Sequence, residues 1–234
     1  MRPDPPWLRR AVAAPMTPRR MSAVLRTLNQ AAPSWDTTAL MAIAQHTGRD
    51  AFKILIACLL SLRTKDETTG PAAARLFALA ETPQALVAVP TRIVEKAIFP
   101  VGFYRTKAKV LHTVARDLLD RFDGRVPPDL DALLTLHGVG RKTANLVITF
   151  GFDLPGVCVD THVHRISNRL GFVSTANPEQ TEFALRAKLP RRHWIGLNDL
   201  LVAFGQNVCH PTSPHCSTCP VAHGCARVGV RQSR

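Results

Sequence analysis

The sequence predicts an all-α fold, on three observations. Apolar residues recur at three- and four-residue spacing through most of the 234-residue chain, as they do on the buried face of an amphipathic helix. No convincing run of alternating β-branched residues occurs, which argues against a sheet. The connections between the periodic segments are short, as packed helices prefer.

Ten segments carry this helical pattern, and several begin with a start signal. Asp160 and Asn177 are N-cap residue types that stand directly before two of them, and Thr82-Pro83 is a further signal of this kind. The predicted helices are residues 21–31, 50–63, 66–79, 91–98, 105–120, 130–136, 142–152, 161–170, 178–188 and 193–207.

The chain is strongly basic, with 30 Lys and Arg against 17 Asp and Glu and a net charge of +13. The usual reason for such an excess is an anionic partner, first a nucleic acid and less often a membrane surface or an acidic protein. No stretch approaches the roughly 20 apolar residues that a membrane span needs. The arginine- and proline-rich residues 1–20 predict a disordered basic arm, with a cleaved targeting peptide as the alternative.

The six cysteines are unevenly distributed. Cys58 and Cys158 lie in apolar segments, where a thiol behaves as a small hydrophobe. Four thiolates on one short loop suit a 4Fe–4S cluster or a zinc ion, although zinc sites more often show two C-x-x-C pairs. We therefore expect a local metal site in a reducing compartment. Its ligands are spaced C-x6-C-x2-C-x5-C and are Cys209, Cys216, Cys219 and Cys225.

Residues 136–145, Leu-His-Gly-Val-Gly-Arg-Lys-Thr-Ala-Asn, place Gly138 and Gly140 between a short predicted helix and a longer one. Glycine permits a positive φ and a close approach of the backbone to a ligand. The turn leads directly into a helix N-terminus, which suits a phosphate oxygen, and Arg141 and Lys142 add positive charge. The pattern indicates a turn that grips a nucleic-acid backbone, and a turn used only for helix packing is the alternative.

The hairpin belongs to a longer set of motifs. It is followed by Val-Asp-Thr-His-Val-His-Arg at 159–165, and Leu-Leu-Ser-Leu-Arg-Thr-Lys-Asp at 59–66 and Val-Gly-Phe-Tyr at 101–104 precede it. Together with the C-terminal cysteines, these motifs resemble the endonuclease III family of DNA glycosylases over about residues 21–226. No single motif is as specific as the combination.

The resemblance implies two helical lobes with a DNA-binding cleft between them. Residues 46–154 would form a barrel-like lobe that carries the helix-hairpin-helix, and residues 21–45 would join 155–234 in a lobe around the metal. Because the cysteine spacing coincides with the family's cluster loop, the resemblance favours a 4Fe–4S cluster over zinc.

The resemblance also implies a nucleophile and its carboxylate partner. Lys142 matches the family's lysine, which attacks C1′ of the damaged nucleotide, expels the base and leaves a Schiff base that permits β-elimination. An amine attacks only when neutral, and the helix N-terminus and Arg141 both disfavour its charged form. Asp160 matches the family's essential aspartate. Taken without the resemblance, Lys142 is a phosphate contact and Asp160 a helix N-cap.

An extruded base leaves a gap that a side chain must fill. Phe103 has the position of the family's wedge residue, with ordinary core as the alternative, and Arg63 stands where many members have a glutamine that enters the stack. Arginine is charged and donor-only, so damage preference is the part of the resemblance that transfers least. His137 replaces the proline usual before the first hairpin glycine. The expected DNA contacts are Arg63, Phe103, Gly138, Gly140, Arg141, Thr143 and His162, the last with a structural role as its alternative.

We therefore expect a bifunctional DNA glycosylase and AP lyase that removes oxidised pyrimidines, such as thymine glycol, from duplex DNA. It would bind double-stranded DNA with a damaged base or abasic site as a monomer, away from membranes, in the bacterial cytoplasm at the nucleoid. One alternative is a glycosylase on the same scaffold for a pyrimidine dimer or a mismatched base. Another is a catalytically silent DNA-binding protein.

Overall fold

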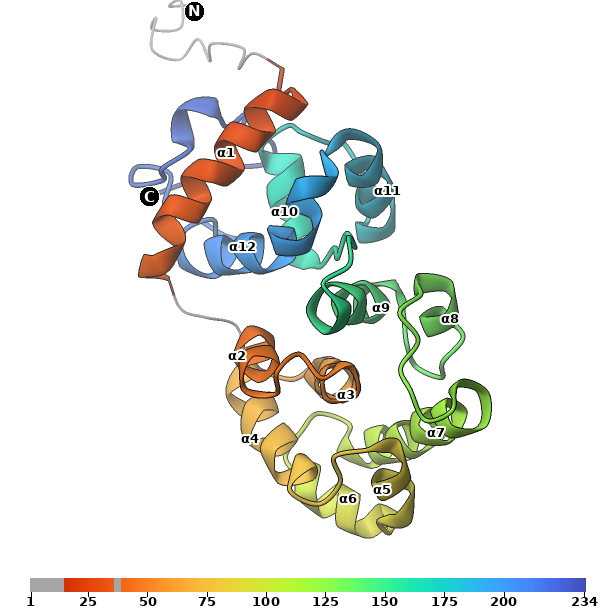
Figure 1. Cartoon of the computed structure of the whole chain (residues 1–234). Helices are drawn as coiled ribbons and strands as arrows, with labels where there is room; N and C mark the ends of the chain where they lie inside the picture. The colour runs from red at the N-terminus through yellow and green to blue at the C-terminus, as the bar shows by residue number, and fades with distance from the viewer. Residues whose placement is uncertain (1–14, 36–38) are drawn as a thin grey trace, which may run out of the picture. The chain divides into compact units, whose positions relative to one another are not determined.

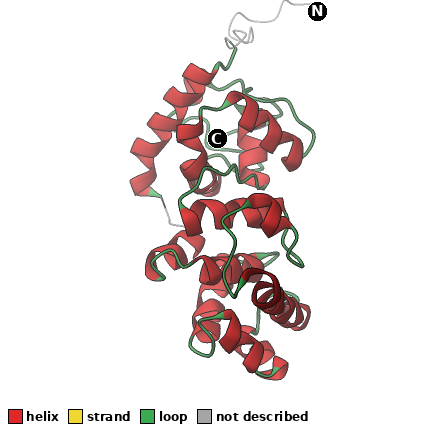
Figure 2. Ribbon diagram, turned by 45° about the vertical axis from the view of Figure 1, so that its right-hand side comes forward, coloured by secondary structure: helices red, strands yellow, loops and turns green. Residues whose placement is uncertain are grey.

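The computed structural model of the chain describes residues 15–35 and 39–234, and all regular structure in these ranges is helical (Figure 2). The predicted all-α class is confirmed. The chain divides into two compact units (Figure 1). The hairpin unit is Thr37–Cys158, and the cysteine unit is Met1–Asp36 with Val159–Arg234.

The hairpin unit is built around one helix that is buried on nearly every side. This helix, α3 (Ala51–Ser61), has eight buried residues among its 11 and contacts α2, α4, α7 and α9. A helix that is apolar all round belongs in a core. The other helices of the unit are α2 (Ala39–His46), α4 (Asp66–Phe77), α5 (Pro83–Ala88), α6 (Thr91–Ile98), α7 (Tyr104–Phe122), α8 (Leu130–Leu134) and α9 (Arg141–Leu146).

Side-chain caps fix several helix starts in the hairpin unit. The Asp50 carboxylate accepts the Lys53 N–H at 2.9 Å, Thr82 Oγ1 accepts the Ala85 N–H at 3.2 Å, and Asp129 caps α8 in the same way. The Thr82-Pro83 signal was therefore correct, and it starts α5, whose six residues are too short for the periodic pattern.

Helix α2 was not predicted. Most of its residues belong to the range 21–45, for which a different packing partner was expected. Residues 21–45 were expected to pack with the cysteine-rich part of the chain, but α2 packs on α3 and α4 inside the hairpin unit. An eight-residue helix shows about two turns of pattern, so its partner is decided by packing and not by local sequence.

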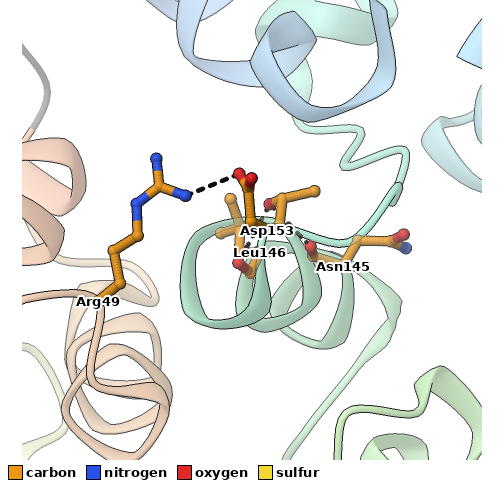
Figure 3. A network of polar contacts seen from close by, with 5 residues as sticks. Arg49, Asn145, Leu146 and Asp153 are labelled. Atoms are coloured by element: carbon orange, nitrogen blue, oxygen red, sulfur yellow. Dashed lines mark hydrogen bonds and ion pairs between the residues drawn. The ribbon is translucent and has the colours of Figure 1, made fainter. Parts of the chain in front are cut away.

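The helix predicted over 142–152 begins one residue earlier and changes type after Leu146. Val147–Gly151 forms a π-helical turn, η3, in which the Thr149 hydroxyl donates to the carbonyl oxygens of Asn145 and Leu146 at 3.0 and 3.1 Å (Figure 3). Such a side-chain bond competes with the backbone pattern and widens the helix locally.

An ion pair just beyond this turn joins two segments that are far apart in the sequence. Arg49, which precedes α3, donates to the Asp153 carboxylate at 2.7 Å across 104 residues of sequence (Figure 3). Both residues have positive φ and both side chains are exposed. An exposed ion pair contributes at most about 1 kcal/mol, so this pair adds little to the stability of the unit.

The cysteine unit contains α1 (Pro18–Ala31), α10 (Thr161–Arg169), α11 (Pro178–Lys188) and α12 (Trp194–Asn207) (Figure 1). Helix α12 contacts α10 and α1. Helix α11 begins as predicted, because the Asn177 side chain accepts the Gln180 N–H at 2.9 Å and Pro178 occupies the first position. Short 3₁₀ turns, η2 (Ala32–Ser34), η4 (Arg191–His193) and η5 (Ala222–Gly224), complete the unit.

The expected basic arm comprises residues 1–20, of which residues 1–14 lie outside the described part of the chain. Its last three residues form the first turn of α1 instead. Thr17 Oγ1 accepts the Arg20 N–H at 3.3 Å and Pro18 follows it, which is a cap-and-proline start that the sequence interpretation passed over.

Within residues 15–35 and 39–234, the structure contains no helix with the length and apolar character needed to cross a membrane.

Candidate functional site

The glycine-rich hairpin joins α8 to α9 through a tight turn. The Val139 N–H donates to the Leu136 carbonyl at 3.1 Å, and Gly138 at the third turn position has φ +76°. This is the type II pattern, which requires glycine at that position. A Cβ at 138 would also come to 3.0 Å from the Val110 side chain. Gly140 differs, since its φ is −95° and a Cβ there would meet open space.

Lys142 lies on the open side of α9. Its side chain is exposed, whereas the residues from Thr143 to Leu146 are all buried. Its Nζ has no hydrogen-bond or ion-pair partner among the described residues. Thr143 is only 2% exposed, so it offers little surface to DNA in this structure. The hairpin therefore presents one amine at the beginning of a helix.

The two thiols in apolar segments are buried free cysteines, as predicted. Burial raises the pKa of the Cys58 thiol to about 12, and the charge of Lys142 offsets a smaller part of that shift. Cys58 is thus a neutral core residue beneath α9.

The segment that leads to Asp160 is bonded to the helix that carries Lys142. The Cys158 thiol donates to the Lys142 carbonyl at 3.7 Å, and the Val157 N–H donates to Asn145 Oδ1 at 3.0 Å. Asn145 also donates to the Arg141 carbonyl at 3.0 Å. Asn145, which ends the hairpin motif, thus joins α9 to the segment before Asp160, a contact that the sequence did not predict.

Asp160 is the N-cap of α10. Its Oδ1 accepts the N–H groups of His162 and Val163 at 2.9 and 2.8 Å, while Oδ2 has no partner among the described residues. The N-cap interpretation is therefore correct for one oxygen, and the other is available to a ligand. The carboxylate is half-buried and held in a single orientation.

His162 packs inside the cysteine unit. Arg165 approaches its Nδ1 at 3.1 Å, and a Cβ at Gly205 of α12 would collide with the same ring. Arg165 itself donates to the carbonyl oxygens of Gly205 and Cys209. These contacts hold the His162 ring within the cysteine unit, and its expected contact with DNA stays a prediction.

Phe103 and Arg63 lie together on the surface of the hairpin unit. Phe103 is 64% exposed, so it is not core, and the Arg63 guanidinium lies 5.9 Å from the centre of its ring. Both residues have positive φ, at 58° and 53°. An exposed aromatic ring next to an arginine suits stacking on a nucleotide base.

The four C-terminal cysteines line one pocket of the cysteine unit. Ile166, Phe204 and Val230 also form its walls, and burial raises the pKa of Cys219 to about 11. Burial raises the pKa of Cys225 as well. Thiols in such a pocket need the charge of a metal to become thiolates. The donor set therefore fits a sulfur-ligated metal group.

Further contacts hold the loop that carries these cysteines. Across the described part of the chain, no three Cys, His, Asp or Glu side chains converge as they would on a single ion. Arg169 braces the loop, because it approaches Cys209 Sγ at 3.4 Å and donates to the carbonyl oxygens of His210 and Pro211 at 2.5 and 2.6 Å.

Comparison with known proteins supplies the family. The profile of the HhH-GPD superfamily of base excision DNA repair proteins matches residues 56–191. Endonuclease III of Thermotoga maritima is 45% identical over 180 residues, which cover 77% of this chain and 84% of that protein. The chain belongs to the endonuclease III family. The resemblance read from its motifs is confirmed.

Other members of the endonuclease III family extend the comparison. Endonuclease III homolog 2 of Arabidopsis thaliana is 45% identical over 183 residues, and the chain spans 47% of that longer protein. A solved non-covalent endonuclease III–DNA complex superposes with a TM-score of 0.79 at 34% identity, covering 89% of this chain and 95% of that one. A trapped covalent endonuclease III–DNA intermediate gives 0.78 at 33% identity, with the same coverage.

Proposed function

We propose that this protein removes oxidised pyrimidines from duplex DNA and cleaves the resulting abasic site, with Lys142 as nucleophile and Asp160 as its carboxylate partner. The enzyme class follows from the family, so the chain is a DNA glycosylase and AP lyase of base excision repair. The observation that carries the assignment of Lys142 is its exposed, unpaired amine directly after the hairpin turn.

The proposed chemistry has two steps. The neutral Lys142 amine bonds to C1′ as the bond to the base breaks, and the base leaves with the bonding electrons and is then protonated. The amine loses its own proton, and ring opening gives a Schiff base. Loss of a proton from C2′ then expels the 3′ phosphate by β-elimination. Asp160 would stabilise the positive charge that develops on the sugar.

Binding would rest on the hairpin and on the basic surface. The free N–H groups at the start of α9 and the charge of Arg141 suit a DNA phosphate, and the net charge of +13 favours association with duplex DNA. Two of the similar endonuclease III structures contain DNA, which supports this partner. One chain supplies all the proposed groups, so we propose that it acts as a monomer.

Phe103 and Arg63 would occupy the gap left by the extruded base. Their exposure and mutual contact support this role. Because Arg63 offers only donors, it would favour an orphaned base that presents acceptors. Arg63 would therefore influence which orphaned base the protein accepts opposite the lesion.

The four cysteines would hold a 4Fe–4S cluster. Cys209, Cys216, Cys219 and Cys225 would be the ligands, and the cluster would order the loop that follows α12. Such a cluster supplies electron transfer and a fixed positive core; no step of base removal is assigned to it.

The test is a panel of duplexes, each with one defined lesion, scored separately for base release and strand cleavage. With borohydride present, the wild-type protein is expected to become covalently trapped on a thymine glycol duplex. Lys142→Gln should abolish trapping and still bind the duplex, whereas Lys109→Gln, which changes an exposed lysine of α7, should trap normally.

Full trapping by Lys142→Gln would remove Lys142 as the nucleophile. Trapping by the wild type only on a pyrimidine dimer or a mismatched base would assign the same chemistry to a different lesion. Binding without base release on every duplex would indicate a silent DNA-binding protein.

A further inference from the structure

Lys107 is a buried lysine whose ammonium is shared among neutral oxygens. It lies on α7 and is 8% exposed. Its Nζ donates to the carbonyl oxygens of Leu60 and Leu62, both at 2.6 Å, and to Thr64 Oγ1 at 3.0 Å. An ammonium has three donors, and all three are used. Burial lowers the pKa of Lys107 to about 8. Burying a charged group costs free energy that an apolar side chain at this position would not cost.

The oxygens that Lys107 binds belong to the segment that carries Arg63. Helix α3 ends at Ser61, so the carbonyl groups at its C-terminal end lack the N–H groups of a following helical turn. A cation at a helix C-terminus satisfies such carbonyls. The helix predicted to run to residue 63 stops short, and Arg63 takes a positive φ of 53°. Lys107 therefore shapes the turn on which Arg63 sits.

The same contacts reach the segment that carries Phe103. Thr64 Oγ1, which binds Lys107, also accepts the Gly102 N–H at 3.2 Å. Gly102 is tight against the first segment, because a Cβ there would lie 2.7 Å from the Arg63 carbonyl oxygen. The Arg63–Phe103 ring contact lies on the outside of this junction. Two segments about 40 residues apart in sequence thus form one hydrogen-bonded structure.

We propose that Lys107 is a positioning residue that holds Arg63 and Phe103 together as one rigid reading element for the gap beside an extruded base. The role of Arg63 and Phe103 at the gap rests on the function proposed above. Their fixed arrangement rests only on the contacts of Lys107. Lys107 itself is too buried to touch DNA, so it acts through the other two residues.

The first measurement uses the free protein. Lys107→Met keeps the length of the side chain and removes its donors, and Lys107→Arg restores donors. Lys109→Met is the matched control, because Lys109 is exposed on the same helix and has the same charge. Hydrogen exchange should speed up at residues 61–64 and 99–104 in Lys107→Met, remain slow in the control, and recover in Lys107→Arg.

The second measurement separates reading from chemistry. Single-turnover base release should fall roughly ten- to a hundredfold in Lys107→Met, because a small misplacement of positioning groups is that costly. Strand cleavage at a preformed abasic site should fall much less, since no base has to be extruded. In a Phe103→Ala background, Lys107→Met should add less than about twofold, because the two changes then remove the same contact.

Thr64→Val provides an independent variant if Lys107→Met folds poorly. It removes only the hydroxyl that joins Gly102 to Lys107, and it should loosen the same two segments. An unchanged exchange rate in these segments, or a full additional loss in the Phe103→Ala background, would overturn the proposal. If the wild type releases no base from any lesion, the proposed function fails, and the exchange data still decide whether Lys107 holds the two segments.

Discussion

At the scale of a residue, Asp160 is a helix cap for which we propose a second purpose. Oδ1 accepts two backbone N–H groups at the start of α10, and this contact fixes the side chain. Oδ2 has no partner among the residues that the structure describes, so it is available to a ligand. An N-cap contributes about 1 kcal/mol to stability. The cap therefore orients the group that we propose takes part in base removal.

The two purposes of Asp160 can be separated by substitution. Asparagine caps a helix about as well as aspartate, so Asp160→Asn should leave the free energy of unfolding almost unchanged. It lacks the negative charge, so base release should fall by roughly a hundredfold or more. Asp160→Ala should lose the same activity and about 1 kcal/mol of stability. Urea unfolding and single-turnover kinetics measure both quantities; a fully active Asp160→Asn would leave only the cap.

At the scale of an element, the two glycines of the hairpin differ in what the structure requires of them. Gly138 is required by the turn, through its positive φ and the nearby Val110 side chain. Gly140 has an ordinary φ and open space at its Cβ position, so the protein's own structure does not require it. Open space beside a helix start is what a closely approaching DNA backbone would need.

Alanine substitutions in the hairpin are expected to separate folding from binding. Gly138→Ala should destabilise the protein by about 1–2 kcal/mol, from the left-handed conformation and the contact with Val110. Gly140→Ala should destabilise the protein by about 0.5–1 kcal/mol, the loss expected when alanine replaces glycine at a helix N-cap, and should weaken binding to duplex DNA. Thermal unfolding and fluorescence anisotropy with a labelled duplex test this pair. Equal DNA affinity in Gly140→Ala would place the DNA backbone elsewhere.

At the scale of the whole molecule, we expect a metal group to stabilise one of the two units and not the other. The hairpin unit has a continuous apolar core that runs through α3, α4 and α7. In the cysteine unit, the chain from Val208 to Arg234 contains only one 3₁₀ turn, and four cysteines surround its pocket. A metal group there would replace the packing that a longer helix provides elsewhere.

Loss of the metal group should therefore affect one unit and spare the other. Cys219→Ser is expected to remove the broad absorbance near 400 nm that an iron–sulfur cluster gives, and to speed hydrogen exchange in residues 208–234. The α3 and α7 amides should keep their protection, because their core contains no cysteine ligand. Ser217→Ala, in the same loop, is the control. Bound zinc without visible absorbance in the wild type would replace the cluster by a Cys₄ site.

Much of the molecule was predictable from local sequence. The helical period gave the all-α class, and Asp160, Asn177 and Thr82 each start a helix as their residue types indicate. The spacing of the four cysteines indicated that they act together, and they line one pocket in the structure. The combined motifs indicated the family. These features are determined by neighbours a few residues apart, which sequence patterns report directly.

Contacts between distant segments were decided only by the tertiary structure. Lys107 looks like any cation on a helix, yet its three acceptors lie more than 40 residues earlier in the chain. Asn145 looks like the end of a motif, yet it binds the N–H of Val157. Helix α2 joins the hairpin unit, because packing of its apolar side and not its place in the sequence selects its neighbours. A local pattern states what a residue is able to bind; only the folded chain brings the partner to it.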